Sequence, residues 1–172
     1  DYEDHLWVFF DTETTGLHYK EAHVQATQLA CVVYNIKDIT EDRKPTETDI
    51  LNVKIALTQE ALKKIAQQDE ETAGKVLTDL EKKELLRNIL AMNDYYEEGA
   101  EFLQLEDAVK QFDDFLKKMR SKSPSGEIVI IAQNSPFDVG VINTAYERLG
   151  LTVPDDKLWD TKAVIHTYLD PI

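Results

Sequence analysis

Two carboxylate side chains lie close together near the start of the chain, directly after an apolar segment. Asp11 and Glu13 follow Trp7–Phe10, and a glycine, Gly16, comes shortly after them. Side chains of a strand alternate between its two faces, so a strand here would place both carboxylates on one side. Two like charges this close repel each other and are costly to desolvate unless a cation lies between them. Carboxylate oxygens are typical ligands of Mg²⁺ and Mn²⁺, so the segment predicts a divalent-metal site.

A second apolar segment also leads to an aspartate. Residues 128–132 are rich in isoleucine and valine, and a short polar turn that contains Asn134 separates them from Phe137 and Asp138. The residues after Asp138 predict a helix, because apolar side chains recur at helical spacing and Gly150 is a typical helix end. This apolar stripe consists of Val139, Ile142, Tyr146 and Leu149. Aspartate is also a favoured helix N-cap, a role that is compatible with binding a metal.

Together these segments resemble the first two motifs of the DEDD-type 3′–5′ exonucleases, the superfamily that includes the proofreading subunit of bacterial DNA polymerase III. The first motif reads Asp-Thr-Glu-Thr-Thr-Gly over residues 11–16. The second has an asparagine, a phenylalanine and an aspartate after a strand, and Asn134, Phe137 and Asp138 match these positions. Both motifs occur in the family's order and in the expected context of a strand.

The resemblance implies an RNase H-like α/β fold. In that fold the first three strands of a mixed sheet are antiparallel, later strands are parallel to the first, and helices flank both faces. It also implies two Mg²⁺ or Mn²⁺ ions about 4 Å apart. By resemblance, Asp11 bridges the ions, Glu13 holds the one that activates water, and Asp138 completes the acidic cluster. The implied reaction releases nucleoside 5′-monophosphates from a 3′ end, with single-stranded DNA as the favoured substrate.

Five further residues are predicted to contact the terminal nucleotide. Thr14, Thr15 and Gly16 would line its approach, because glycine lets the backbone and the substrate come close. Asn134 and Phe137 are the candidates from the second motif. Each has a structural alternative: a plain turn for Thr15, Gly16 and Asn134, and the hydrophobic core for Phe137.

The family's third motif, a histidine or tyrosine general base followed by a fourth carboxylate, has no match with the right spacing. His166 and Asp170 have three residues between them, whereas the His-type branch has four. Tyr168 would need an aspartate where Ile172 stands. Residues Trp159–Val164 resemble the helix that precedes this motif, so His166 and Asp170 are expected to be surface neighbours. We therefore expect an exonuclease domain that ends before its third motif.

Composition limits the class of protein and the mode of substrate binding. The 172 residues suit a single domain spanning 1–172, and no apolar run is long enough to cross a membrane. The single cysteine, Cys31, is expected in the core of a cytoplasmic protein. The net charge of −14 is unusual for a protein that binds a long stretch of nucleic acid. Either the protein binds only the end of a strand, or its affinity for nucleic acid comes from a polymerase or another replication protein.

The remaining pattern predicts the order of the elements. The predicted strands are Leu6–Phe10, Gln28–Ile36, Leu51–Leu57 and Glu127–Ala132. The segment Asp38–Asp49 is expected to be a hairpin loop, and 58–122 to be mainly helical. Within it, Thr78–Glu81 has the form of a capping box, and the last helix has one apolar face. Residues 69–101 are interpreted as a helical insertion, either a solvated face or a surface for a partner.

Two alternatives to a DNA exonuclease remain open. The chain could be a catalytically silent scaffold with an exonuclease fold in a replication complex, which suits the acidic composition. It could also be a 3′–5′ exoribonuclease, because nothing in the motifs distinguishes DNA from RNA at the 2′-hydroxyl.

Overall fold

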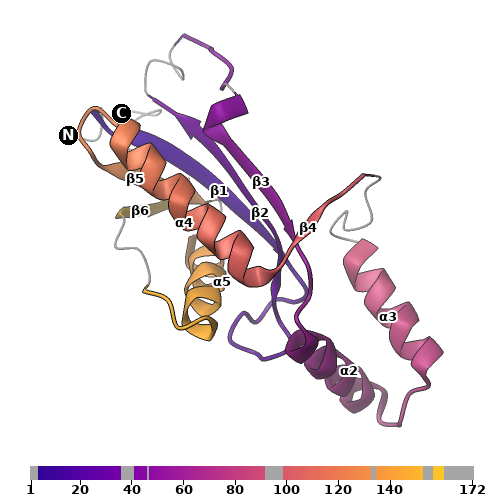
Figure 1. Cartoon of the computed structure of the whole chain (residues 1–172). Coiled ribbons are helices and arrows are strands. Elements are labelled where there is room, and N and C mark those ends of the chain that lie inside the picture. Colours follow the sequence, from indigo (N-terminus) through magenta and orange to yellow (C-terminus); the bar gives the residue numbers. More distant parts are fainter. Residues whose placement is uncertain are drawn as a thin grey trace, which may run out of the picture.

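The computed structural model describes residues 4–35, 41–45, 47–91, 99–132, 135–152 and 157–160. Within them, six strands form one mixed sheet in the order β4-β3-β2-β1-β5-β6 (Figure 1). The strands are β1 (Leu6–Thr14), β2 (Ala26–Tyr34), β3 (Ile50–Ile55), β4 (Phe102–Leu103), β5 (Ile128–Ala132) and β6 (Lys157–Asp160). The pairs β1–β2 and β2–β3 are antiparallel, whereas β4 runs parallel to β3, β5 runs parallel to β1 and β6 runs parallel to β5. The predicted mixed sheet is therefore confirmed.

The first strand is longer than its apolar segment. It continues to Thr14 because its backbone stays paired with β2, where Asp11 lies opposite Ala30 and Glu13 lies opposite Gln28. The ladder becomes irregular only between Glu13 and Thr14. Both carboxylates therefore belong to the strand itself rather than to a loop after it.

The prediction of a helix beginning at Trp159 is wrong at its start. Residues Lys157–Asp160 form β6, with Trp159 paired to Ile131 of β5. Pairing with a strand far away in the sequence decides the conformation here, and local pattern does not reveal it. Residues 161–172, which include His166, Tyr168 and Asp170, lie outside the described part of the chain.

The described α-helices are α2 (Gln59–Ala73), α3 (Asp79–Ala91), α4 (Leu105–Lys122) and α5 (Ser135–Arg148), and a 3₁₀ helix, η2, spans Glu47–Asp49. The Thr78 hydroxyl caps α3 by accepting the Glu81 backbone N–H at 3.2 Å, as the capping box predicts. Helix α3 lies within the predicted insertion 69–101, whereas α2 begins before it.

The core lies between the sheet and two helices, α4 and α5. The predicted apolar face of α4 is buried along its length: Leu105, Ala108, Val109, Phe112, Phe115, Leu116 and Met119. Phe112 contacts Phe10 of β1, with ring centroids 6.2 Å apart. The Tyr146 hydroxyl of α5 donates to Asp113 of α4 at 3.0 Å. Cys31 is 1% exposed, as predicted. Within the described residues these two helices pack on one face of the sheet, so α5 and the end of β1 are held close together.

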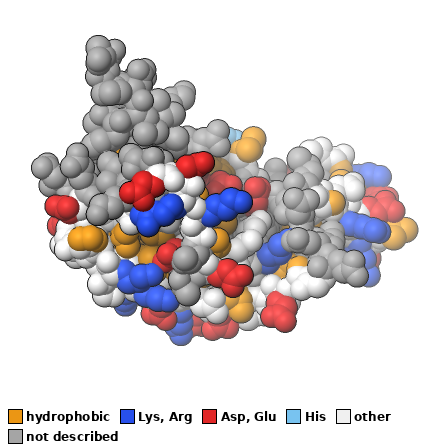
Figure 2. Space-filling model, turned by 90° about the horizontal axis from the view of Figure 1, so that it is seen from above, with side chains coloured by type: hydrophobic (Ala, Val, Ile, Leu, Met, Phe, Trp, Pro, Cys, Tyr) orange, Lys and Arg blue, Asp and Glu red, His pale blue; other side chains and the backbone are white. Residues whose placement is uncertain are grey.

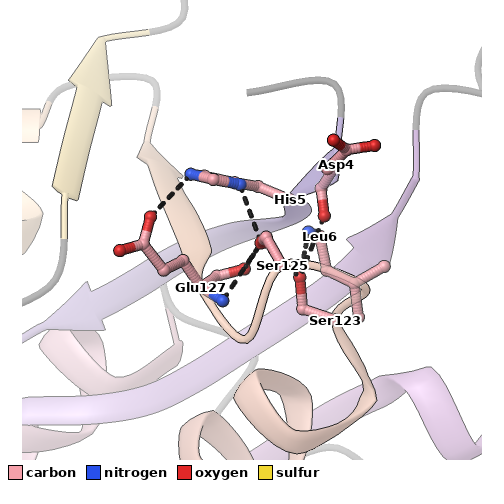
Figure 3. A network of polar contacts seen from close by, with 6 residues as sticks. All are labelled: Asp4, His5, Leu6, Ser123, Ser125 and Glu127. Atoms are coloured by element: carbon pink, nitrogen blue, oxygen red, sulfur yellow. Dashed lines mark hydrogen bonds and ion pairs between the residues drawn. The ribbon is translucent and has the colours of Figure 1, made fainter. Parts of the chain in front are cut away.

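A buried histidine fixes the other end of β1 (Figure 3). His5 is 5% exposed, and its Nδ1 lies 2.8 Å from the Ser125 hydroxyl while its Nε2 lies 3.0 Å from Glu127. The Ser123 hydroxyl accepts the Leu6 backbone N–H at 3.1 Å. These contacts join the start of β1 to the turn before β5, which sets the register of the parallel pair.

The surface carries charges of both signs. In Figure 2, the acidic and basic side chains of the described residues are interspersed on the face that is shown. Several of the basic groups pair with acids on the same element, for example Lys110 with Glu106 at 3.1 Å. None of the described helices has the length and apolar character needed to cross a membrane.

Candidate active site

The two carboxylates of β1 share one face of the strand, and the residue between them faces the other way. Asp11 is exposed and Glu13 is half-buried, whereas Thr12 is only 7% exposed. The alternation of the strand produces this division. It places the carboxylates opposite the face on which α5 packs.

Asp138 joins β1 from the first turn of α5. Its side chain is 3% exposed, and its Oδ1 accepts two hydrogen bonds from Thr12: one from the hydroxyl at 2.7 Å and one from the backbone N–H at 3.3 Å. The described pairing of β5 with β1 ends at Phe9 and Ile131. Among the described residues no strand pairs with Thr12 on this edge of β1, and Asp138 accepts the backbone N–H of Thr12 there.

The two motifs thus meet on β1, but the described residues do not complete a metal-binding cluster. Asp11, Glu13 and Asp138 are hard oxygen donors suited to Mg²⁺ or Mn²⁺. Among the described residues, however, no three histidine, cysteine, aspartate or glutamate side chains lie close enough together to hold an ion. The pair on β1 fits one side of such a site, and Asp138 reaches the same strand through Thr12. Asn134 lies outside the described residues.

The loop after the first motif is closed at its base by Thr15. This residue is 8% exposed, and its hydroxyl donates to the His23 carbonyl at 2.8 Å and accepts the Gln25 N–H at 3.0 Å. The hydroxyl of Thr14 donates to the Gly16 carbonyl at 2.6 Å. A Cβ atom on Gly16 would lie 2.9 Å from Val24 Cγ2, so glycine allows a close approach within the loop itself. Both threonine hydroxyls therefore have structural roles, and their contact with substrate stays a prediction.

Phe137 packs in the periphery of the core, the structural alternative for this residue. It is half-buried, and its ring meets that of Tyr19 edge to face with centroids 6.1 Å apart. Sequence reasoning did not identify Tyr19, because a tyrosine in a polar loop has no recognisable pattern. It also did not identify Thr12, whose importance depends on its contact with Asp138.

A buried glutamine connects the loop with α2. Gln25 is 3% exposed, and its amide donates to the carbonyls of Ala26 and Ala56, both at 3.1 Å. Its Oε1 accepts the backbone N–H of Thr58, the N-cap of α2, at 3.0 Å. Farther along this helix, burial raises the pKa of Asp69, and the nearby His23 of the loop partly offsets the rise. Helix α2 therefore lies beside the loop that follows the first motif.

Comparison with known proteins gives similarity in sequence over a short segment and similarity in fold over nearly the whole chain. The chain is 48% identical over 42 residues to a PolC-type DNA polymerase III of Listeria welshimeri, and 45% identical over 42 residues to that of Listeria monocytogenes. A structure of exonuclease I with bound product superposes over 98% of the chain with a TM-score of 0.58 and 13% identity. The chain has the fold and the first two motifs of a DEDD-type exonuclease.

The chain spans only a part of each protein that it matches. The 42 matched residues are 24% of this chain and 3% of each polymerase. The exonuclease I superposition covers 33% of that protein. A second superposition, on E. coli exonuclease I in complex with a dT13 oligonucleotide, has a TM-score of 0.53 and 13% identity. It covers 31% of the exonuclease I chain. No family model matches the sequence.

Proposed function

We propose that the protein is a metal-dependent 3′–5′ exonuclease that removes nucleoside 5′-monophosphates from the 3′ ends of DNA. The observation that carries the proposal is the pair of hydrogen bonds between Thr12 and Asp138, which brings the second motif onto the strand of the first. The similarity of fold to exonuclease I and of sequence to PolC-type polymerases supports it. E. coli exonuclease I, one of these neighbours, binds single-stranded oligonucleotides.

In this proposal Asp11 and Glu13 hold divalent cations on the open face of β1, and Asp138 contributes from the edge. The bound cations, Mg²⁺ or Mn²⁺, would activate water and stabilise the developing negative charge. Water adds to the phosphorus atom, the bond from phosphorus to the 3′-oxygen breaks, and the shortened strand keeps a 3′-hydroxyl. Other residues of the chain would bind and orient the terminal nucleotide. Leu17, next to Gly16, is 82% exposed and offers an apolar surface to a base.

The test is the digestion of a 5′-labelled single-stranded DNA oligomer by the full-length protein with Mg²⁺, with Mn²⁺ and with EDTA. We expect a ladder of labelled products that shorten from the 3′ end, and no ladder in EDTA. Asp11→Asn should abolish the ladder, while Asp114→Asn, which changes an exposed aspartate on α4, should leave it intact. Immediate release of the label would indicate the opposite direction, and an unchanged rate in Asp11→Asn would exclude this site.

A catalytically silent scaffold in a replication complex is the second candidate. The net charge of −14 favours it, because an acidic surface repels a phosphate backbone. The absence of any ladder with either metal would support this function over the exonuclease. A matched RNA oligomer in the same assay separates the exoribonuclease from the DNA exonuclease.

A further inference from the structure

The loop between β1 and β2 lies against α5 (Figure 1). Its residues 17–25 come directly after the first motif, and α5 carries Asp138 in its first turn. Two sets of contacts hold the loop there, one through an aromatic ring and one through a guanidinium group.

The aromatic contact requires a glycine in the helix. The Tyr19 ring packs against Phe137 and over Gly140. A Cβ atom built on Gly140 would lie 2.2 Å from Cζ of Tyr19, a separation at which the ring must move. Glycine inside a helix is unfavourable relative to alanine. Room for the Tyr19 ring gives a physical reason for this otherwise unfavourable residue.

The second contact comes from the last turn of the same helix. Arg148 donates from Nη1 to the Val24 carbonyl at 2.7 Å and from Nη2 to the Glu21 carbonyl at 3.0 Å. The planar guanidinium directs two donors at two backbone acceptors, which a single ammonium group cannot reproduce. Partial burial lowers the pKa of Arg148, but a guanidinium stays charged in proteins. Its hydrogen bonds therefore persist across the ordinary pH range.

These contacts lie on a helix whose start is already fixed to β1. Asp138 holds the first turn of α5 to Thr12, and Thr15 closes the base of the loop. The strand, the loop and the helix are thus connected by the contacts of four residues: Thr15, Tyr19, Asp138 and Arg148. Moving the loop away from α5 breaks the Tyr19 and Arg148 contacts without disturbing the bonds between Asp138 and Thr12.

We propose that Tyr19, Gly140 and Arg148 form a loop clamp that holds residues 17–25 in the position that receives the 3′-terminal nucleotide. This inference rests on the proposed exonuclease function and adds positioning residues to it. Gly140 and Arg148 act through the loop and do not contact the reacting atoms. Releasing the clamp should weaken substrate binding more than it slows the chemical step, because the carboxylates stay on β1 and at the start of α5.

Steady-state kinetics on a single-stranded DNA oligomer test the clamp in the full-length protein. Gly140→Ala and Arg148→Ala should each raise KM about tenfold, the scale expected when loop ordering is added to the cost of binding. We expect kcat to stay within about twofold. Arg87→Ala, which removes an exposed arginine from α3, is the matched control and should change neither constant.

A double-mutant cycle separates the clamp from general damage to the helix. In a Tyr19→Ala background the ring is gone, so adding Gly140→Ala should raise KM no further. Alanine favours the helix, so the Gly140→Ala protein should remain folded. Trypsin cleavage after Lys20, an exposed residue of the loop, reports loop release without any substrate and should be faster in Gly140→Ala and Arg148→Ala.

The outcomes separate the two proposals. A wild-type protein that shortens DNA, together with unchanged KM values in Gly140→Ala and Arg148→Ala, overturns the clamp and leaves the exonuclease intact. A wild-type protein that produces no ladder overturns the exonuclease and the role of the clamp in it. In that case the rates of trypsin cleavage after Lys20 show whether Gly140 and Arg148 hold the loop against α5. Equal cleavage rates in the wild type and in all variants would exclude this structural role as well.

Discussion

The contact between Thr12 and Asp138 is the connection between the two motifs that can be measured without any assumption about activity. Both side chains are almost fully buried, and Asp138 Oδ1 accepts from the Thr12 hydroxyl at 2.7 Å and from the Thr12 backbone N–H at 3.3 Å. A buried hydrogen bond to a carboxylate contributes roughly 1.5–3 kcal/mol. Thr12→Val removes the hydroxyl donor and keeps the branched shape, so we expect it to lower the free energy of unfolding by about 2 kcal/mol.

A double-mutant cycle isolates this interaction. Asp138→Ala alone leaves two buried donors of Thr12 unsatisfied, whereas in the Thr12→Val background only the backbone donor is affected. We therefore expect the two substitutions to be coupled by about 2 kcal/mol. Urea unfolding in EDTA, which removes any contribution of divalent cations, measures the four proteins. For a domain of this size, a loss of about 2 kcal/mol corresponds to a fall in Tm of roughly 4–8 °C.

Thr12→Ser serves as the control because it keeps the hydroxyl and loses only a methyl group, a cost of about 1 kcal/mol. A coupling energy within about 0.5 kcal/mol of zero would refute the contact. So would a Thr12→Ser protein that is destabilised as much as Thr12→Val. Either result would leave the two motifs without a measurable hydrogen bond between them.

Three further predictions follow from other buried groups. Burial alone would raise the pKa of Asp113, but hydrogen bonds from Lys117 and Tyr146 hold it below its usual range. Tyr146→Phe should therefore cost about 1 kcal/mol in urea unfolding at neutral pH, and this difference should shrink as the pH falls through the Asp113 pKa, because the stability from a depressed carboxyl pKa is lost on protonation. Burial raises the pKa of the Cys31 thiol, so a thiol reagent at neutral pH should label this cysteine only after denaturation, and rapid labelling of the native protein would contradict its burial. Gln25→Leu removes partners from the Thr58 N–H and the Ala56 carbonyl, and a loss of about 3 kcal/mol is expected in the same unfolding assay.

Local patterns were sufficient for the elements that depend on local sequence. The helical repeat of α4 predicted its whole buried face, because side chains three and four residues apart on a helix lie on one side. The capping box at Thr78 predicted the start of α3 in the same way. Strand alternation predicted that Asp11 and Glu13 share a face, and pairing with β2 through Glu13 is consistent with it. These features depend only on residues that are close together in the sequence, so the sequence is enough to predict them.

Local sequence patterns did not predict contacts between segments that are far apart in the chain. The residues around Trp159 carry no signal that distinguishes a helix from a strand, and their pairing with β5 decides it. In the same way, Gly140 is an ordinary small residue in the sequence. Its importance follows from the Tyr19 ring that crosses it, more than a hundred residues away along the chain.

The sequence by itself determined that Asp11, Glu13 and Asp138 follow two apolar segments, and it predicted a metal-dependent nuclease from their type and spacing, which are properties of the chain. Only the tertiary structure decided that Asp138 reaches β1 through Thr12, and that Arg148 holds the loop after the first motif. Such contacts depend on where β5 ends and how α5 then packs. The end of β5 and the packing of α5 are set when the whole core folds, so they cannot be inferred from any short segment of the sequence.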